Sequence, residues 1–395
     1  MGVFSFGGVT MSRTRNPMSI AVGLLCLVVT AGSAQNTLVD VGGHKLNVRV
    51  AGTAFPGVPT VVFESGLGSP LAAWASVPSS IAGSARTIAY ERAGIGQSER
   101  GTEPPTVKHI VAELHTLLGK LNAPPPYILV GHSWGGPIIH MFAGTYPKEV
   151  AGLVYVDPTD FTQTEADMLA VWETAGAKDP RDALAKSSAA NMMPPGAPAG
   201  VMAEAREVQR AQQGGFAELR AAGDGPDVPT VILLAGKTDP LPPNLPPFPA
   251  DFAKFFQANL DQRVEHFGLL ARRAGGGTLV LTSKSSHFVQ LSEPELVVWG
   301  IQRVLSATSS HAELQRFVGE YTLTPDFVMT VTRDGGKLSL QATAQPAFVL
   351  TPESATTFSI KVVDAVIEFE TDPTGKVTAL VLVQNGARQR APKTK

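Results

Sequence analysis

A serine held between two glycines is the feature of this sequence best suited to chemistry. The apolar run 127–130 leads into the pentapeptide GHSWG at residues 131–135, and a helical stretch follows. A strand that turns this sharply into a helix holds the serine in a strained backbone conformation, and the glycines let the two elements approach each other. The pattern predicts that Ser133 is a nucleophile at the tip of the turn.

A serine nucleophile needs a base that takes its proton and an acid that holds the base in one tautomer. We expect His287 to be the base, because it lies in a loop directly after the last apolar run. Parallel sheets usually have their catalytic and binding residues in such loops, at the carboxyl ends of the strands. We prefer Asp239 as the acid, since it follows the run 230–234 and gives the chain order serine, aspartate, histidine. Asp157 is the competing acid, because it follows the preceding apolar run at the same edge of the sheet.

The negative charge that develops on a substrate's carbonyl oxygen needs backbone donors. Trp134 follows the serine at the start of a helix, so its N–H is one expected donor. The second donor is expected from the glycine-rich loop at residues 64–68, where the N–H of Leu67 would face the substrate. These two N–H groups form the predicted oxyanion hole. His132 precedes the serine on the strand side and is expected to point away from it.

The elements that must position these residues alternate between strand and helix. Six short, continuous apolar runs are typical of strands buried on both faces, and they lie at residues 60–63, 86–90, 127–130, 152–156, 230–234 and 278–281. Stretches with apolar residues at helical spacing separate them. The alternation predicts an α/β domain over residues 35–305 with a doubly wound, mostly parallel sheet.

Three segments depart from this alternation. Residues 158–228 are rich in alanine, methionine and glutamine, and we interpret them as a mostly helical cap insertion over the site. Large apolar cap residues such as Met168 and Trp172 either pack the cap's own helices or contact the substrate. The serine- and threonine-rich residues 306–311 predict a linker. Residues 312–390 alternate polar and apolar residues between turn signals, which predicts a small antiparallel all-β domain.

The first 34 residues predict a signal peptide. Arg13 and Arg15 precede an apolar run at 20–29 and a small-residue stretch that ends before Gln35, and the run is too short to span a bilayer. We therefore expect a periplasmic or secreted protein, without stable membrane insertion once the signal is removed. The only cysteine, Cys26, lies in this segment, so the mature chain would use neither disulfides nor thiolate chemistry.

Composition and motifs argue against some partners and cofactors. The 395-residue chain has 44% hydrophobic and 17% charged residues, which is ordinary for globular proteins. Removing residues 1–34 takes away two arginines and no acidic residue, so the formal net charge falls from −2 to −4. This charge argues against nucleic acid as a partner. The sequence has no H-E-x-x-H, no P-loop and no G-x-G-x-x-G that opens a helix, so we expect neither a metal nor a nucleotide cofactor.

Four motifs in this order resemble the α/β-hydrolase superfamily over residues 38–305. They are the pentapeptide at 131–135, the stretch YERAGIGQS at 90–98, Asp239, and the tripeptide SHF at 286–288. The resemblance implies the α/β-hydrolase fold and a Ser-His-Asp hydrolase that works through an acyl-enzyme. The β domain resembles those appended to some secreted serine hydrolases.

This sequence departs from the superfamily's pattern at two positions. Ser65 stands where many members have histidine before the oxyanion glycine, and Glu91 stands where aspartate is commoner before the arginine. The loop 65–68 lacks the triple glycine of one class of lipases and esterases. The serine nucleophile differs from the aspartate that epoxide hydrolases and dehalogenases use.

These observations predict an exported serine hydrolase that cleaves a small-molecule carboxylic ester. An aminopeptidase, a lactonase or a carbon–carbon bond hydrolase of the same fold would carry nearly the same residues, because substrate choice depends on the cap. An aminopeptidase would need a buried carboxylate for the substrate's amino group, and the cap offers Glu165, Asp167 and Glu173. A different class of function is a non-catalytic binding protein on a hydrolase scaffold, with the β domain holding the ligand.

Overall fold

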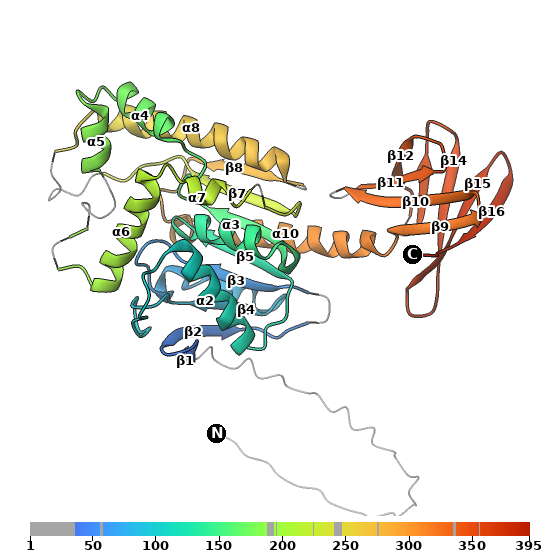
Figure 1. Ribbon diagram of the computed structural model, residues 1–395, viewed down its shortest axis with the longest axis horizontal. Helices are drawn as coiled ribbons and strands as arrows, with labels where there is room; N and C mark the ends of the chain where they lie inside the picture. The colour runs from blue at the N-terminus through green and yellow to red at the C-terminus, as the bar shows by residue number, and fades with distance from the viewer. Residues whose placement is uncertain are drawn as a thin grey trace, which may run out of the picture. The chain divides into compact units, whose positions relative to one another are not determined.

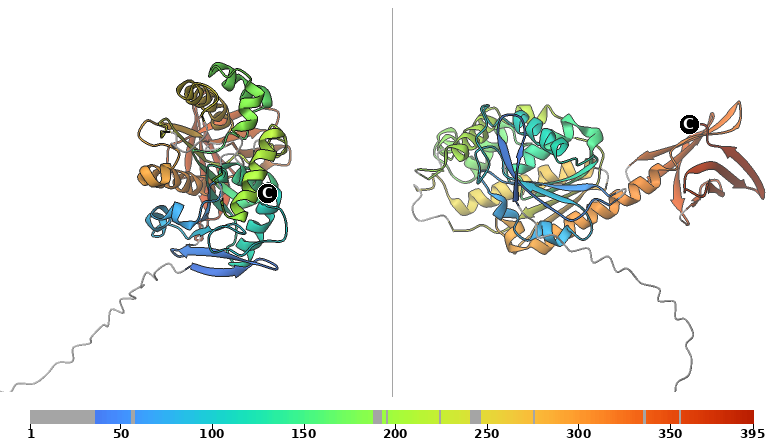
Figure 2. Two further views of the ribbon diagram at one scale, coloured as in Figure 1. Left: turned by 90° about the vertical axis from the view of Figure 1, so that its left-hand side faces the viewer. Right: turned by 90° about the horizontal axis from the view of Figure 1, so that it is seen from below.

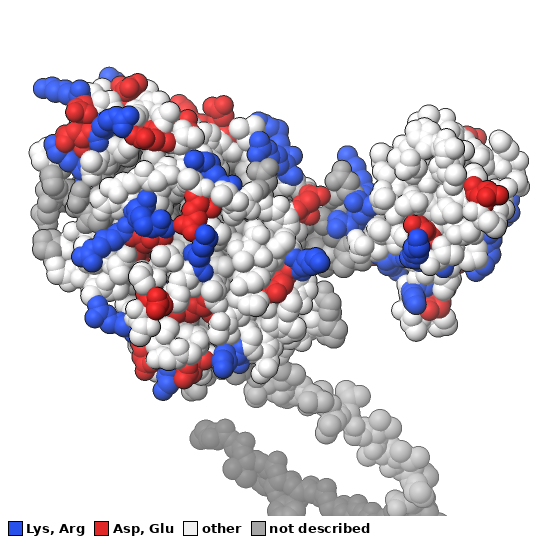
Figure 3. Space-filling model, viewed as in Figure 1, with Lys and Arg blue, Asp and Glu red and all other residues white. Residues whose placement is uncertain are grey.

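The computed structural model describes most of the chain. The described residues are 36–55, 58–187, 193–194, 196–223, 225–240, 247–274, 276–334, 337–354 and 356–395. The segment 1–34 lies outside them, so the signal peptide stays a prediction. Within these ranges, no helix combines the length and the apolar character needed to cross a bilayer. On the face drawn in Figure 3, acidic and basic side chains of the described residues lie interspersed.

An eight-stranded, mostly parallel sheet forms the first part of the fold (Figure 1), in the order β1-β2-β4-β3-β5-β6-β7-β8. Its strands are β1 Asn36–Asp40, β2 Lys45–Ala51, β3 Thr60–Glu64, β4 Thr87–Tyr90, β5 Tyr127–His132, β6 Val150–Val156, β7 Thr230–Ala235 and β8 Thr278–Thr282. The first two strands pair antiparallel, β2 also runs antiparallel to β4, and the remaining pairs are parallel. The predicted doubly wound, mostly parallel sheet is confirmed.

Helices cover both faces of this sheet, because side chains alternate along each buried strand. Along β5, Leu129 packs into one core, and Ile128 and Val130 pack into the other. The first core includes residues from α2 Val107–Lys120, α3 Gly135–Thr145 and α8 Phe252–Arg273. The second includes residues from η1 Leu71–Trp74, α1 Val77–Ile81, α9 Val289–Ser292 and α10 Pro294–Gln315. The carboxyl ends of the parallel strands are thereby left for the site.

The described residues of the insertion between β6 and β7 form four helices. They are α4 Glu165–Thr174, α5 Pro180–Lys186, α6 Ala199–Gln213 and α7 Ala217–Arg220. Local sequence sets where two of them begin: Thr164 and Asp167 form a reciprocal capping box at α4, and Asp179 caps α5 ahead of a proline in the first turn. The views in Figures 1 and 2 agree in placing α4 beside α8.

The described residues of the C-terminal part form an antiparallel sheet of eight strands in sequential order, β9 to β16, which confirms the predicted antiparallel β structure. The strands are β9 Gly319–Thr324, β10 Phe327–Asp334, β11 Lys337–Ala342, β12 Ala347–Pro352, β13 Thr357–Ile360, β14 Ala365–Thr371, β15 Val377–Gln384 and β16 Ala387–Pro392. Alternate residues such as Ile367 and Phe369 point into one apolar core. The residues that follow β16 return to the first strand, since Glu320 of β9 exchanges backbone hydrogen bonds with Thr394 and Lys395. An isolated antiparallel bridge also joins Tyr321 to Lys393.

The linker predicted at 306–311 is a continuation of helix α10, which runs unbroken to Gln315. A run of serine and threonine is compatible with a helix when its hydroxyls bond carbonyls one turn back. Thr308 does so, because its Oγ1 donates to the carbonyl oxygen of Val304 at 2.7 Å. Thr308 is also buried, with a longer contact of 3.4 Å to the carbonyl oxygen of Ala151 in β6. The segment is therefore helical, and its role as a linker stays a prediction.

Candidate active site

The turn between β5 and α3 holds Ser133 in a strained conformation. Ser133 has a φ of 50°, in the left-handed region that non-glycine residues rarely adopt. A Cβ on Gly131 would lie 2.5 Å from the carbonyl oxygen of Gly135, and a Cβ on Gly135 would lie 2.3 Å from that of Glu64. Glycine at both positions lets β3, β5 and α3 come this close. The serine is thereby presented at the carboxyl edge of the parallel strands.

The hydroxyl of Ser133 meets an imidazole, and the imidazole meets a carboxylate. Ser133 Oγ lies 2.9 Å from His287 Nε2, and His287 Nδ1 lies 2.7 Å from Asp157 Oδ2. When Nδ1 carries the proton and donates a hydrogen bond to Asp157, Nε2 has the lone pair that accepts the serine proton. The structure thus brings the predicted nucleophile and the predicted base into one hydrogen-bonded relay.

The acid in this relay is Asp157, so the preference for Asp239 is corrected. Asp157 directly follows β6, which lies beside β5 in the sheet, and its side chain is only 4% exposed. Asp239 lies on an exposed, irregular stretch beyond β7. That stretch reaches the histidine loop through its backbone, because Lys237 N–H donates to the carbonyl oxygen of Ser285. The strand next to the nucleophile therefore supplies the carboxylate.

Two further donors hold Asp157 in place. Its Oδ1 accepts the backbone N–H of Ala235 at 2.9 Å and Arg263 Nη2 at 2.7 Å. Burial by itself would raise the pKa of Asp157, but Arg263 and His287 hold that pKa below its ordinary value. The carboxylate therefore stays ionised opposite the imidazole. Sequence reasoning did not find Arg263, because nothing in the amphipathic pattern of α8 distinguishes it from other polar residues.

His132 lies against the relay, contrary to the expectation that it would point away. Its ring centroid is 4.7 Å from that of His287, and its Nε2–H donates to the carbonyl oxygen of His287 at 2.9 Å. Burial and the neighbouring His287 lower the pKa of His132 to about 3. The ring of His132 is therefore neutral at ordinary pH. It adds no positive charge beside His287, the predicted base.

The depressed pKa of His132 predicts a loss of stability in acid. The unfolded chain binds a proton at this residue below pH ~6.5, whereas the folded chain does not bind it until the pH approaches 3, so the free energy of unfolding falls between those values. We expect His132→Gln to reduce the slope of that fall by about 1.4 kcal/mol per pH unit. Urea unfolding at several values from pH 7 to pH 4 measures both slopes, and equal slopes would contradict the prediction.

The loop after β3 lies beside the nucleophile, where the second oxyanion donor is expected. A Cβ on Gly66 would come within 3.2 Å of the Ser133 Cβ and within 2.9 Å of His132 Nδ1. Among the described residues, no hydrogen bond uses the backbone N–H of Leu67 or of Trp134. Both N–H groups are therefore available to a bound oxygen.

Arg92 holds the carbonyl side of this loop. Its Nη1 donates to the carbonyl oxygen of Ser65 at 2.7 Å, and its Nη2 donates to that of Gly66 at 2.7 Å. Burial would lower the pKa of Arg92, but its ion pairs with Glu204 and Glu64 raise that pKa above the usual value, so the guanidinium is charged. Sequence analysis did not assign this residue to the site, although its place in the motif at 90–98 was a signal for it.

A cavity of about 420 Å³ opens beside the relay, and Asp157 and His287 are among its lining residues. Aromatic side chains line much of it, namely Trp172, Phe248, Phe252 and Phe255. Gln163, Asn259 and Arg263 add polar groups. Trp172 also stacks on Phe248 and contacts Phe255, so this cap residue both packs and lines the cavity. The space suits an apolar or aromatic group of a substrate.

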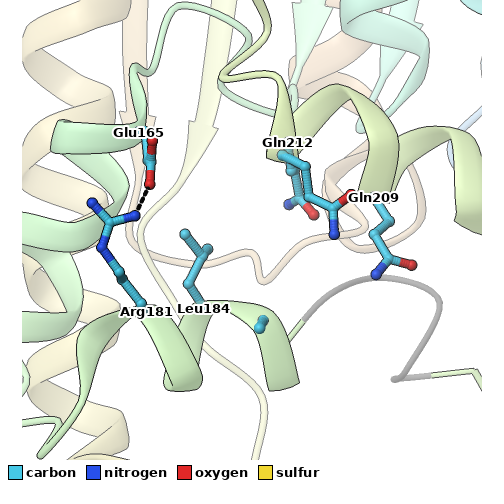
Figure 4. Close-up of a pocket in the computed structure, with 7 residues that line it drawn as sticks. Glu165, Arg181, Leu184, Gln209 and Gln212 are labelled. Carbon is cyan, nitrogen blue, oxygen red and sulfur yellow. Dashed lines mark hydrogen bonds and ion pairs between the residues drawn. The ribbon is translucent and has the colours of Figure 1, made fainter.

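A smaller cavity of about 180 Å³ lies within the cap and shares Leu184 and Gln212 with the first. Figure 4 shows Leu184 and Arg181 on one helix and Gln212 on another, with Arg181 paired to Glu165. The smaller cavity has no aromatic residue in its described lining, whereas the larger one beside the relay has four.

Parts of this chain are similar to known proteins. The family described as alpha/beta hydrolase fold matches residues 59–300, and a domain of unknown function, DUF3471, matches residues 305–391. An uncharacterised Bacillus subtilis protein, YqjL, is 34% identical over 99 residues, which are 25% of this chain and 39% of YqjL. The putative carbamate hydrolase RutD of Cronobacter turicensis is 28% identical over 113 residues, which are 28% of this chain and 42% of RutD. The chain thus aligns with less than half of the length of these relatives.

Among solved structures, a loop variant of the haloalkane dehalogenase DbeA from Bradyrhizobium elkanii superposes with a TM-score of 0.52. The two chains are 14% identical, and the match covers 72% of this chain and 100% of the dehalogenase. At this level of identity the likeness shows the fold alone.

Proposed function

Because the chain belongs to the α/β-hydrolase family, we propose that it is a serine hydrolase that cleaves carboxylic esters through an acyl-enzyme on Ser133. The observation that carries the proposal is the relay in which His287 lies 2.9 Å from Ser133 Oγ and 2.7 Å from Asp157. Serine is inert at neutral pH without such a base, and a carboxylate fixes the tautomer that the base needs.

In the proposed first step, Ser133 Oγ attacks the ester carbonyl while His287 Nε2 takes the serine proton. The N–H groups of Leu67 and Trp134 bind the oxyanion of the tetrahedral intermediate. Asp157 accepts the hydrogen bond of His287 Nδ1 and stabilises the imidazolium without taking its proton. The intermediate then collapses, the alcohol leaves with the proton from Nε2, and Ser133 carries the acyl group.

In the second step, His287 takes a proton from water, and the water oxygen attacks the acyl carbonyl. The same two N–H groups bind the second oxyanion. Collapse of this intermediate returns the proton to Ser133 Oγ and releases the acid. Each part of the site therefore acts twice, once in each half of the cycle.

The carboxylates near the relay favour an ester over a peptide with a free amino group. Asp157 and Asp160 are the carboxylates that line the larger cavity in the described residues. Asp157 is held by Arg263 and His287, and Asp160 by His266 at 2.8 Å and by Thr162. Neither is left to bind a substrate's ammonium group, which an aminopeptidase requires.

The cap carboxylates considered for an aminopeptidase are also engaged or exposed. Glu165 pairs with Arg181, Asp167 accepts hydrogen bonds from Thr164, and Glu173 is exposed on α4. Within the described residues, none of the three lines the larger cavity. This supports the ester over the amino-terminal peptide bond.

Hydrolysis of p-nitrophenyl esters with acyl chains of increasing length tests the proposal. We expect the wild type to turn over these esters, with a preference for acyl groups that the cavity of about 420 Å³ accepts. Ser133→Ala and His287→Ala should each lower kcat by a factor on the order of 10⁴ to 10⁶. A p-nitrophenyl carbamate belongs in the series, because a relative bears the name of a putative carbamate hydrolase.

A fluorophosphonate probe provides the matched control, since it labels an activated serine covalently without turnover. Labelling of the wild type and not of Ser133→Ala would place the nucleophile at this residue. Turnover that survives in Ser133→Ala would contradict the proposal. A folded wild type that neither turns over esters nor takes up the probe would instead favour a binding protein on this scaffold.

A further inference from the structure

Glu204 is a cap residue whose carboxylate is buried against the oxyanion loop. It lies on α6 and is 0% exposed. Its Oε2 accepts the backbone N–H of Gly68 at 2.8 Å, directly after the predicted donor Leu67. Its two oxygens also form a bidentate pair with Arg92, at 2.6 Å to Nε and 2.8 Å to Nη2. A side chain of the cap thus contacts the loop that carries half of the oxyanion hole.

The same guanidinium fixes the peptide that contains the Leu67 N–H. Arg92 Nη2 donates both to Glu204 and to the carbonyl oxygen of Gly66. In a planar trans peptide, the carbonyl oxygen of Gly66 and the N–H of Leu67 point in opposite directions. Holding that carbonyl toward Arg92 therefore aims the N–H away from Arg92, and Gly66 itself lies against Ser133.

Close backbone contacts hold α6 at this position along the loop. A Cβ on Gly200, in the first turn of α6, would lie 2.2 Å from the carbonyl oxygen of Gly94. A Cβ on Gly68 would lie 2.8 Å from a methyl carbon of Val201. These distances leave the helix little freedom to slide, so Glu204 and Gly68 stay in register.

We propose that Glu204 is a positioning residue for the oxyanion hole, so that the cap completes the catalytic geometry as well as enclosing the substrate. The proposal rests on the proposed serine hydrolase function. Glu204 acts from both sides of Leu67: it binds Gly68 N–H directly, and it orients Arg92, which binds the carbonyl oxygen of Gly66. Glu204 is not among the described residues that line the larger cavity beside the relay.

Glu204→Gln tests this role with an almost isosteric side chain. The amide oxygen keeps one acceptor for Gly68 N–H, but the charge that orients Arg92 is lost. We expect kcat on the best p-nitrophenyl ester to fall by roughly 10 to 100-fold, with KM changed less than about threefold, because the donor is misplaced in the transition state more than in the ground state. The affinity for an alkyl boronic acid, which forms a tetrahedral adduct on serine, should fall in parallel.

Glu207→Gln is the matched control on the same helix. Glu207 is also buried, and it pairs with Arg210 at 2.7 Å, but it contacts no residue of the oxyanion loop in the described structure. We expect this variant to lose stability while its kcat stays within about twofold of the wild type. Assays run well below both melting temperatures separate the chemical step from unfolding.

A second variant covers the case in which Glu204→Gln does not fold. Glu204→Asp keeps the charge but is one methylene shorter, so it cannot hold Gly68 N–H and Arg92 at the same time. We expect a smaller loss of kcat from this variant, again with little change in KM.

The outcomes distinguish failure of the role proposed for Glu204 from failure of the proposed serine hydrolase function. If Ser133→Ala keeps its activity, the proposed function is wrong and the role of Glu204 falls with it. If Ser133→Ala is inactive while Glu204→Gln or Glu204→Asp behaves like Glu207→Gln, or loses activity through KM alone, the role of Glu204 is overturned and the proposed function stands.

Discussion

Asp157→Asn is expected to lower kcat on a good ester substrate by about 10⁴-fold, although the backbone of the site stays in place. An asparagine amide either donates to His287 Nδ1 or holds the ring less firmly, so Nε2 no longer has the lone pair aimed at Ser133. Asp239→Asn, on the exposed stretch beyond β7, is the matched control and should change kcat less than about twofold.

Melting curves must accompany these assays, because Asp157→Asn also leaves Arg263 without its buried counter-ion. Measurement at a temperature where both variants are folded isolates the chemical effect. A large loss in Asp239→Asn together with near-normal turnover in Asp157→Asn would restore Asp239, the acid preferred from the sequence.

Gly135→Ala is expected to destabilise the fold by about 3 kcal/mol or more and to abolish most activity. The new Cβ would lie 2.3 Å from the carbonyl oxygen of Glu64 and 2.9 Å from that of Ser65. Both oxygens belong to the backbone, so they cannot move aside as the end of a flexible side chain could. Relief of the clash must move β3 and the oxyanion loop away from the nucleophile turn.

Gly119→Ala on α2 is the control for this effect. A Cβ there meets nothing within 4 Å, so alanine should stabilise the helix by up to about 1 kcal/mol and leave activity unchanged. Thermal or urea unfolding of the two variants measures the contrast. Equal stability of Gly135→Ala and the wild type would show that the turn relaxes more easily than the distances imply.

The predictions of the strands, of the turn at Ser133 and of the sheet edge rest on local patterns. Continuous apolar runs identify strands buried on both faces, and a G-x-S-x-G turn needs only its own neighbours to place Ser133. His287 follows the last strand of the parallel sheet, so its edge of the sheet was also predictable. Each of these signals lies within a few residues of the feature that it predicts.

The choice of acid needed information that chain order does not contain. Asp157 and Asp239 both lie after a buried strand and between the serine and the histidine in the chain. What separates them is that β6, and not β7, lies next to β5. Glu204 and Arg92 are 112 residues apart, and only the packing of α6 on the main domain brings them together. Helix α10 continues through residues 306–311, and Thr308 is buried there, which the composition of the segment does not indicate.

The backbone contacts between Glu320 and the residues after β16 limit where a further strand can add to the C-terminal sheet. An open edge strand offers a row of unpaired amides and carbonyls, on which a peptide or a second copy can template a further strand. Glu320 already pairs with residues 394 and 395. The backbone N–H and carbonyl oxygen of Glu320 are therefore not available to an added strand.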